Sequence, residues 1–406
     1  MITNKDYQKS LLIILVFLLI FESILILISG LDRPYWGDEV HFVRTIKEFG
    51  QGITLDRLKH YNEMSTPLPF IVYALWGRLW GFEIENLRVL SLLIATITYL
   101  LFHFLVFNIF RNSKTAFWLT VFLIIQPYMI GLSFFVFTDM LTMLFLLLGL
   151  LALIKQNPWL WTLSSAGGLL CRQYFIFFTL AAGIYFTTKL LVEKDKSTSK
   201  MIISTTLSLI PLLILILLWK GLSPENSRKE LYLKDGLFFH PEYLTLYICL
   251  FFVYLFPIIL QNWKNYYSHL KLLIIFLFIS GIYFIFPVEA SQPAKAVHVD
   301  TVGLFHRFIR LILGEKFEHI IFFIAFWLSL PVLYRILQDG YQRWQRRQLD
   351  FGLLLDLSIV LFLIIMPFSY VVWEKYFIPI IPIAALQMIW SRKYPLMNSS
   401  IPKLQI

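Results

Sequence analysis

The stretch Leu11–Ser29, LLIILVFLLIFESILILIS, decides the class of fold, because its nineteen residues carry a single charged side chain, Glu22. A helix needs about 20 apolar residues to cross a bilayer. The run is too long for a signal-peptide core and lacks a small-residue cleavage site, so we expect it to remain as the first membrane helix. Similar runs recur as far as residue 391. The composition, with 58% apolar residues, 15% charged residues and a mean hydropathy of +0.72, lies outside the range of soluble proteins.

We therefore predict an all-α polytopic membrane protein in which residues 1–406 form one transmembrane domain. Twelve spans are expected, near residues 11–30, 88–110, 115–131, 139–155, 159–170, 174–190, 201–219, 244–261, 272–287, 317–336, 352–373 and 376–391. Residues 31–87 are expected to form an outer loop that contains an interfacial helix. Its apolar part, residues 67–81, is short, begins with two prolines and contains Arg78, so we expect it to lie at the interface, and a true span is the alternative.

The distribution of charge supports this topology. The formal net charge is +10, but no basic stripe or stacking module indicates a nucleic-acid partner. With the N-terminus inside, the inner segments carry eighteen basic and six acidic residues, and the outer segments carry seventeen basic and eighteen acidic residues. This asymmetry follows the positive-inside rule. If residues 67–81 crossed the membrane, every later loop would change sides.

No metal or disulfide chemistry is indicated. Cys171 and Cys249 lie in apolar surroundings without the ligand spacing of a zinc site. The sequence also lacks a DxD motif and the ligand spacing of a calcium loop, so we expect no metal and no cofactor.

Polar residues gather in the outer segments, where membrane proteins place much of their function. They are Asp38, Glu39 and His41 in the first loop, Asp139, the Arg172-Gln173 pair, Asp235 with His240, the group His298, Asp300, His306 and Arg307, and Glu374-Lys375. Several have a structural alternative when taken alone: Asp139 as a helix cap, Glu374-Lys375 as a solvated turn, and His298 as a loop histidine.

Two of these groups point to chemistry more strongly. Asp38-Glu39 follows the first helix by about eight residues and lies among aromatic side chains, and carboxylates at a membrane boundary are commonly retained for function. Arg172 is enclosed by apolar sequence and therefore needs an anionic partner, for which a lipid phosphate is suited. A carboxylate base and cations at one lipid face fit the transfer of a sugar from a polyprenyl phosphate.

The order of motifs resembles the dolichyl-phosphate-glucose α-1,2-glucosyltransferases, within the GT-C type of membrane glycosyltransferases. The resemblance rests on these residues: Trp36, Asp38, Glu39 and His41; Ser65, Thr66, Pro67 and Pro69; Thr138-Asp139; Arg172-Gln173; Lys234, Asp235, Gly236 and His240; His298, Asp300, His306 and Arg307; and Glu374, Lys375, Tyr376 and Pro379. It covers nearly the whole chain in colinear order. The chain departs from the family at Lys375, where the family has arginine, and after Gln173, where Tyr-Phe replaces Thr-Asn.

The resemblance implies transfer of a hexose, with glucose expected, from a polyprenyl or dolichyl phosphate to a lipid-linked or other glycan acceptor. Asp38 is then the catalytic base with Glu39 as the alternative. We assign the donor phosphate to Arg172, Gln173, Arg307 and Lys375. The donor and acceptor pocket is assigned to His41, Thr66, Asp139, His240, His298, Asp300, His306 and Glu374.

Two other classes of function remain open. A transporter or flippase of lipid-linked oligosaccharide would also be polytopic, although such proteins tend to contain two related halves, and no repeat relates residues 11–200 to 201–391. A non-catalytic scaffold would give Asp38-Glu39 no purpose. We expect the cytoplasmic membrane of a bacterium or archaeon, with the active site outside. The ER membrane with a lumenal site is the alternative.

Overall fold

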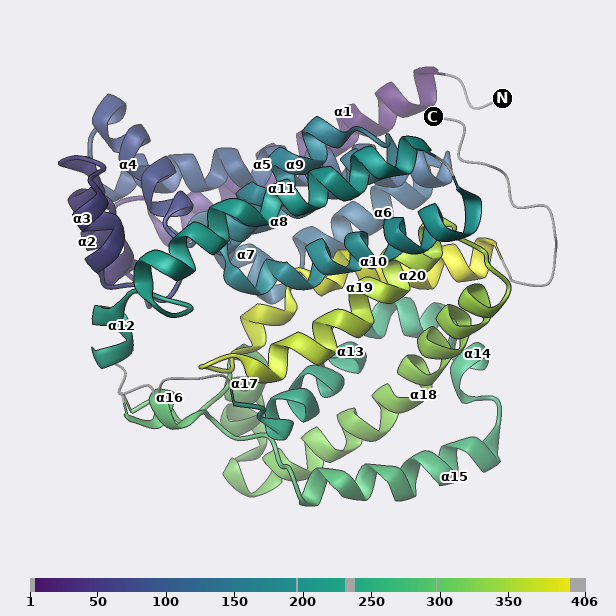
Figure 1. Cartoon of the computed structure of the whole chain (residues 1–406). Helices are drawn as coiled ribbons and strands as arrows, with labels where there is room; N and C mark the ends of the chain where they lie inside the picture. Colours follow the sequence, from purple (N-terminus) through teal and green to yellow (C-terminus); the bar gives the residue numbers. More distant parts are fainter. Residues whose placement is uncertain (1–3, 195, 231–237, 297, 395–406) are drawn as a thin grey trace. The chain divides into compact units, whose positions relative to one another are not determined.

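The computed structural model describes residues 4–194, 196–230, 238–296 and 298–394. Every regular element in these ranges is a helix (Figure 1). The helices group into two compact units. Unit 1 holds residues 4–176 and 199–230, and unit 2 holds the other described residues. The predicted all-α polytopic membrane class is confirmed.

Unit 1 contains the N-terminal helices and most of α11. Its helices are α1 (Asn4–Ser29), α2 (Glu39–Gly50), α3 (Leu55–His60), α4 (Leu68–Trp80), α5 (Ile84–Phe110), α6 (Ser113–Ile124), α7 (Pro127–Phe134), α8 (Asp139–Ile154), α9 (Pro158–Cys171), η1 (Gln173–Phe175), α11 (Lys196–Trp219) and α12 (Glu225–Glu230). Helix α5 forms the centre of this unit, since α1, α6, α7 and α8 all pack against it, and α8 packs in turn against α9.

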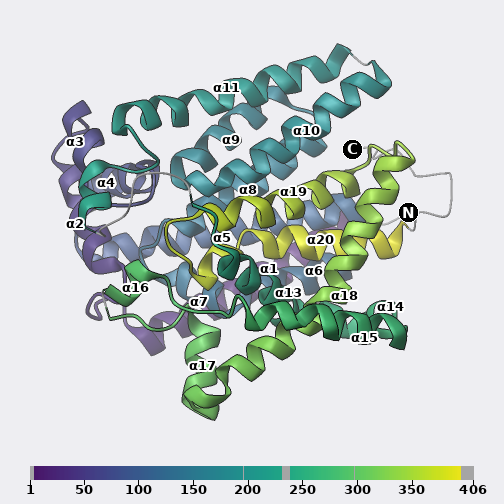
Figure 2. The ribbon, with the colours of Figure 1, turned by 60° about the horizontal axis from the view of Figure 1, so that its bottom comes forward.

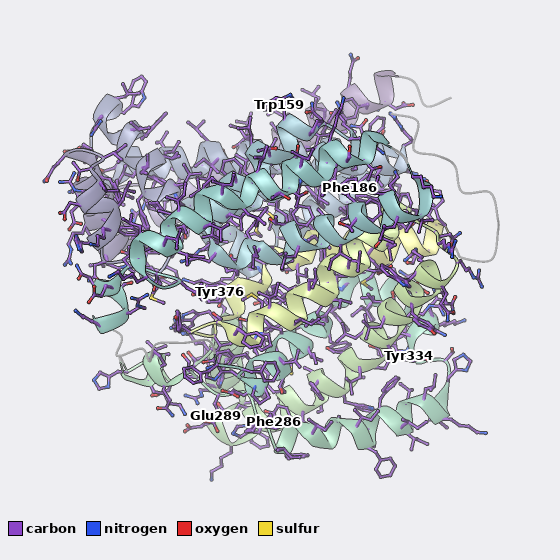
Figure 3. All side chains as sticks on the ribbon, viewed as in Figure 1. Trp159, Phe186, Phe286, Glu289, Tyr334 and Tyr376 are labelled. Atoms are coloured by element: carbon purple, nitrogen blue, oxygen red, sulfur yellow. The ribbon has the colours of Figure 1, made fainter. Side chains whose placement is uncertain are left out.

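Unit 2 contains the remaining helices. They are α10 (Ile176–Glu193), α13 (Pro241–Gln261), α14 (Trp263–Tyr267), α15 (Leu270–Ile279), η2 (Ser280–Phe284), α16 (Gln292–Ala296), α17 (Leu304–Leu313), η3 (Glu315–Phe317), α18 (Glu318–Gln345), α19 (Phe351–Ile365), η4 (Met366–Phe368), η5 (Glu374–Phe377) and α20 (Ile380–Lys393). Helices α19 and α20 run side by side, as Figures 1 and 2 both show. Tyr334 of α18, labelled in Figure 3, packs on Phe276 of α15 with ring centroids 5.6 Å apart.

The number of spanning helices is lower than predicted. In the described residues, seven helices are long and apolar enough to cross a membrane, and an eighth is added if the bent pair α6 and α7 counts as one span. Each of the twelve predicted ranges overlaps a helix, but α8 has 16 residues and α9 and α20 have 14 each. These helices are shorter than the roughly 20 residues that a bilayer requires. The prediction of twelve spans is therefore too high by this measure.

The break between α6 and α7 shows why one predicted span fails. The two helices meet at an angle of 75°. Pro127 begins α7, and a proline disfavours helical geometry in the residue before it. Gln126 accordingly has extended dihedral angles, φ −61° and ψ 131°. A continuous helix over residues 115–131 is thus excluded by local geometry.

Helix α4 corresponds to the run 67–81, whose position was left open. It has 13 residues, or about 20 Å of helix, which is less than the roughly 30 Å of a hydrocarbon core. Phe82 lies against both Gly77 of α4 and Gly50 at the end of α2. A Cβ atom at either glycine would come within 2.5 Å of the Phe82 ring. These two glycines allow the ring to sit against the ends of α2 and α4, which pack on each other.

Candidate functional site

The first loop places Asp38 at the start of α2. Gly37, with a φ of 59°, makes the turn before it, a backbone conformation that glycine adopts without strain. The Asp38 side chain makes no capping bond to the helix and is 38% exposed. Its Oδ1 lies 3.8 Å from Nε2 of His41. The carboxylate is therefore accessible and has an imidazole beside it.

His41 lies between two carboxylates. Its Nδ1 is 2.8 Å from Oε1 of Glu63, a buried side chain that also accepts a bond from the Thr45 hydroxyl at 3.2 Å. Burial by itself would lower the pKa of His41, but hydrogen bonds and charge attraction from Asp38 and Glu63 outweigh it and raise this pKa to about 9. At neutral pH His41 is thus a cation.

Glu39 has a different environment from its neighbour Asp38. It is fully buried and accepts two bonds from the Arg88 guanidinium, at 3.1 and 2.7 Å. The backbone N–H groups of Trp36 and Val136 also donate to it, each at 2.9 Å. A buried carboxylate that accepts from four donors, two of them in a bidentate pair with an arginine, is held in one orientation by the protein. Glu39 therefore has the geometry of an anchor rather than of a base.

Arg88 extends this anchor to the loop before α2. Its guanidinium donates to the carbonyl oxygens of Leu31 and Arg33, both at 2.8 Å, and stacks 5.4 Å from the ring of Phe134. One side chain of α5 thus contacts the segment after α1, the start of α2 and the end of α7. The position of Asp38 is set by this arrangement.

Arg172 has a protein carboxylate as a partner. Its Nη2 donates to Oδ2 of Asp139 at 2.7 Å, and both side chains are buried. The Tyr174 hydroxyl donates to the other oxygen of Asp139 at 3.2 Å. Asp139 is the first residue of α8 and not its N-cap, which is Thr138. The alternative of Asp139 as a helix cap is therefore not what the structure has. The anion that the sequence demanded for Arg172 is supplied by Asp139.

Two segments connect Asp38 and its neighbours to the ion pair of Arg172 and Asp139. In residues 63–66, Glu63 binds His41, the Met64 carbonyl accepts from the Gln173 amide at 2.6 Å, and the Thr66 hydroxyl donates to the Leu169 carbonyl at 3.0 Å. In residues 136–139, the Val136 N–H binds Glu39 and Asp139 binds Arg172. One network in unit 1 thus joins seven predicted site residues: Asp38, Glu39, His41, Thr66, Asp139, Arg172 and Gln173.

Unit 2 holds the remaining predicted residues that the structure describes. Glu374 is fully buried and accepts bonds from the backbone N–H groups of Phe305 and His306, each at 2.9 Å, at the first turn of α17. The Tyr254 hydroxyl donates to it at 3.1 Å. A carboxylate at this position is favoured by the helix N-terminus, so Glu374 forms a buried cap and not the solvated turn that was its structural alternative. Its place in the donor and acceptor pocket stays a prediction.

His306 is also part of this structural cluster. Its Nδ1 accepts from the Val302 N–H at 3.3 Å, so Nε2 carries the proton and donates to Glu318 at 2.8 Å. Burial lowers the pKa of His306 and favours this neutral form. Arg310 binds the same Glu318. His306 therefore holds α17 to α18.

The other predicted residues of unit 2 are not part of this buried hydrogen-bonded cluster. Arg307 is exposed and donates to the Thr301 hydroxyl at 3.2 Å, and Lys375 lies 6.0 Å from the ring centroid of Tyr376, which Figure 3 labels. His298 and Asp300 are exposed. His240 binds Glu242 at 3.2 Å and stacks on Tyr243. Lys234, Asp235 and Gly236 lie outside the described residues.

Comparisons with known proteins find a remote likeness. No protein-family model and no curated protein matches the sequence. Among solved structures the chain is similar to ArnT from Cupriavidus metallidurans in the apo state. The two share 12% identity at a TM-score of 0.40, over 92% of this chain and 77% of that chain. The candidate site consequently rests on its own geometry.

Sequence reasoning missed two charged members of the unit 1 network, Arg88 and Glu63. Arg88 opens an apolar run, and its position at the head of a predicted span is the signal that could have identified it. Glu63 carried no comparable signal, because it lies in a polar loop and only the folded chain brings it to His41. Among the described residues, no group of three His, Cys, Asp or Glu side chains could hold a metal ion.

Proposed function

We propose that this protein is a membrane glycosyltransferase of the GT-C type that moves a hexose from a polyprenyl phosphate to a hydroxyl group of a glycan acceptor. The observation that carries the proposal is the unit 1 network, in which an exposed carboxylate, a cationic imidazole and a buried arginine share one hydrogen-bonded frame. The resemblance in motif order supports glucose as the sugar and a 1,2 linkage.

The reaction is a displacement at the anomeric carbon. The acceptor hydroxyl gives its proton to Asp38 while its oxygen forms a bond to the anomeric carbon from the face opposite the phosphate. The bond from that carbon to the phosphate oxygen breaks, and its electron pair leaves with the lipid phosphate. The configuration at the carbon is inverted. A positioned base of this kind contributes about two to four powers of ten in rate.

The other residues of the network position Asp38 and the donor. The pair of Glu39 and Arg88 fixes the start of α2, and His41 places a positive charge beside the base. Arg172 is assigned to the leaving phosphate, with Gln173 beside it in unit 1. The bond to Asp139 uses one of the five N–H donors of its guanidinium and orients the group. Cations fixed in this way stabilise charge that develops on the leaving group.

The test is a transfer assay with the purified full chain in detergent. Radiolabelled polyprenyl phosphate hexoses are supplied with a panel of lipid-linked and free glycan acceptors, and a covalent product carrying the label is expected. The same protein in sealed vesicles distinguishes the transporter. Movement of a labelled lipid-linked oligosaccharide across the membrane without any new glycosidic bond would overturn the proposal.

A further inference from the structure

Unit 2 contains a cavity of about 340 Å³ that plays no part in the proposed reaction. It lies where α14, the turn before α15, the second half of α18 and the end of α20 come together. In Figures 1 and 2, α14 lies next to α18, on which it packs. The residues that line the cavity include Lys264, Asn265, Ser268, His269, Arg335 and Arg392. A volume at the lower end of the range for small-molecule sites is suited to a compact polar group.

The charges of this cavity favour an anion. Three permanent cations, Lys264, Arg335 and Arg392, face one carboxylate, that of Asp339. Asp339 is already bound by Arg335, with 3.3 Å between the carboxylate oxygen and Nε, and its side chain is only 5% exposed. Lys264 and Arg392 are exposed and make no hydrogen bond or ion pair with the described part of the chain. An anion in the cavity would meet two cations that no protein carboxylate neutralises.

The surroundings of the cavity match a lipid headgroup. Leu260, Trp263 and Leu270 flank α14 and are 51%, 40% and 70% exposed, so apolar surface adjoins the basic residues. Tryptophan at such a position is typical of the membrane interface. All three cations of the lining belong to segments that the charge asymmetry assigns to the inner side, where anionic lipids gather and basic pockets between helices bind their headgroups.

We propose that this cavity binds a phosphate group, with Lys264 and Arg392 as its principal contacts. The guanidinium of Arg392 offers a planar fork to two phosphate oxygens, and Lys264 adds a point charge. Two sources share this chemistry: the phosphodiester of an anionic phospholipid, and a soluble phosphate compound. The proposal concerns the basic side of unit 2 and is independent of sugar transfer.

The experiment follows the thermal unfolding midpoint of the purified full chain during titration with four probes. These are short-chain phosphatidylglycerol, short-chain phosphatidylcholine, glycerol 3-phosphate and inorganic phosphate. A ligand that binds the folded state raises the midpoint. The cavity variant is Lys264→Gln with Arg392→Gln. Its matched control is Lys271→Gln with Arg347→Gln, which removes the same two charge types at exposed positions that do not line the cavity.

We expect wild type and control to bind phosphatidylglycerol alike and the cavity variant to bind it roughly thirtyfold more weakly, since each basic residue near an anionic surface contributes about fivefold. Phosphatidylcholine should bind to none of them. If only phosphatidylglycerol binds, the source is a lipid. If glycerol 3-phosphate or inorganic phosphate binds with the same dependence on the variant, the source is a soluble phosphate compound.

Equal affinities in the cavity variant, the control and the wild type would overturn the proposal, as would equal loss in the variant and the control. If the cavity variant is unstable, a single substitution replaces it. Arg392→Glu alone then reverses one exposed charge without touching the pair of Arg335 and Asp339, and it should abolish binding.

Discussion

Asp38 and Glu39 are adjacent in the chain but face different surroundings, and that contrast supports the roles proposed for them. Asp38 is exposed beside a cationic imidazole, whereas Glu39 is fully enclosed by donors. Proton transfer requires access to the acceptor, which only Asp38 has. The sequence identified the pair, and the motif resemblance placed Asp38 before Glu39. It could not show the physical reason for that order, because the reason depends on Arg88, 49 residues away from Glu39.

The first prediction separates these two carboxylates. Asp38→Asn keeps the shape of the side chain but removes the base, so turnover in the transfer assay should fall by about two to four powers of ten. The unfolding midpoint should fall only slightly, because only the partly exposed contact with His41 is weakened. Glu39→Gln leaves the Arg88 charge uncompensated in a buried site, which should cost about 3–5 kcal/mol of stability. Full turnover in Asp38→Asn would remove this residue from the chemistry.

The second prediction concerns the pH dependence of stability. His41 has a pKa raised from 6.5 to about 9 in the folded chain, so its ion pairs stabilise the protein fully below pH 6.5. That contribution is lost progressively as the pH rises from 6.5 to 9. The difference in unfolding midpoint between wild type and His41→Gln should therefore shrink across this window. A constant difference from pH 6 to 10 would show that the charge of His41 is not involved.

The third prediction concerns the leaving phosphate. Arg172→Lys keeps a positive charge near Asp139 but loses the fork, whereas Arg172→Ala also leaves Asp139 buried without this partner. We expect the alanine variant to lose donor use strongly and the lysine variant to recover part of it, measured as KM for the lipid donor. Asp139→Asn serves as a control for loss of the pair. An alanine variant with normal donor KM would exclude Arg172 from the phosphate site.

Among the secondary-structure elements, α2 and α4 pack on each other within residues 31–87 of unit 1. Phe82 fits against Gly50 and Gly77, where any Cβ atom would overlap its ring. This contact could not be predicted, because a glycine near the end of an apolar run is compatible with many environments. The Phe82 ring meets both glycines only because α4 packs on α2 in the folded chain.

The fourth prediction tests this packing. Gly77→Ala should displace the Phe82 ring and lower stability by about 1–3 kcal/mol, the usual cost of overpacking. Gly131→Ala in α7 is the matched control, since its nearest neighbour would lie at 3.9 Å, an ordinary contact. Thermal unfolding of both variants decides the matter. Equal midpoints for the two would mean that the ring can move aside freely.

For the molecule as a whole, hydropathy predicted the class and the location of the apolar segments, and each predicted range overlaps a helix. It could not predict helix lengths. The mean hydropathy of the run 115–131 stays high across Gln126 and Pro127, so hydropathy does not detect the change of helix direction there. The site was predictable where a charged residue interrupts apolar sequence, as at Arg172. It was not predictable where a partner comes from a polar loop, as with Glu63.

The fifth prediction concerns membrane topology. The positive-inside rule requires Asp38, Arg172, His298 and Glu374 to face one compartment and Arg346 the other. Single cysteines at the exposed positions Val40, His298 and Arg347 report these sides in a background where both native cysteines are replaced. Val40 and His298 should react with an impermeant thiol reagent from one side, and Arg347 from the opposite side. Labelling of the cysteines at positions 347 and 40 from the same side would contradict the predicted topology.

The ion pair of Glu39 and Arg88 also limits how these two positions can change during evolution. Loss of either residue alone leaves a buried charge, whereas exchange of both for apolar residues of similar volume is tolerated in many proteins. Here a double exchange would preserve folding but release the backbone carbonyl oxygens of Leu31 and Arg33, and with them the start of α2. Among descendants of a common ancestor, the two positions should therefore change together, and lineages that have lost both should have lost the function of Asp38 as well.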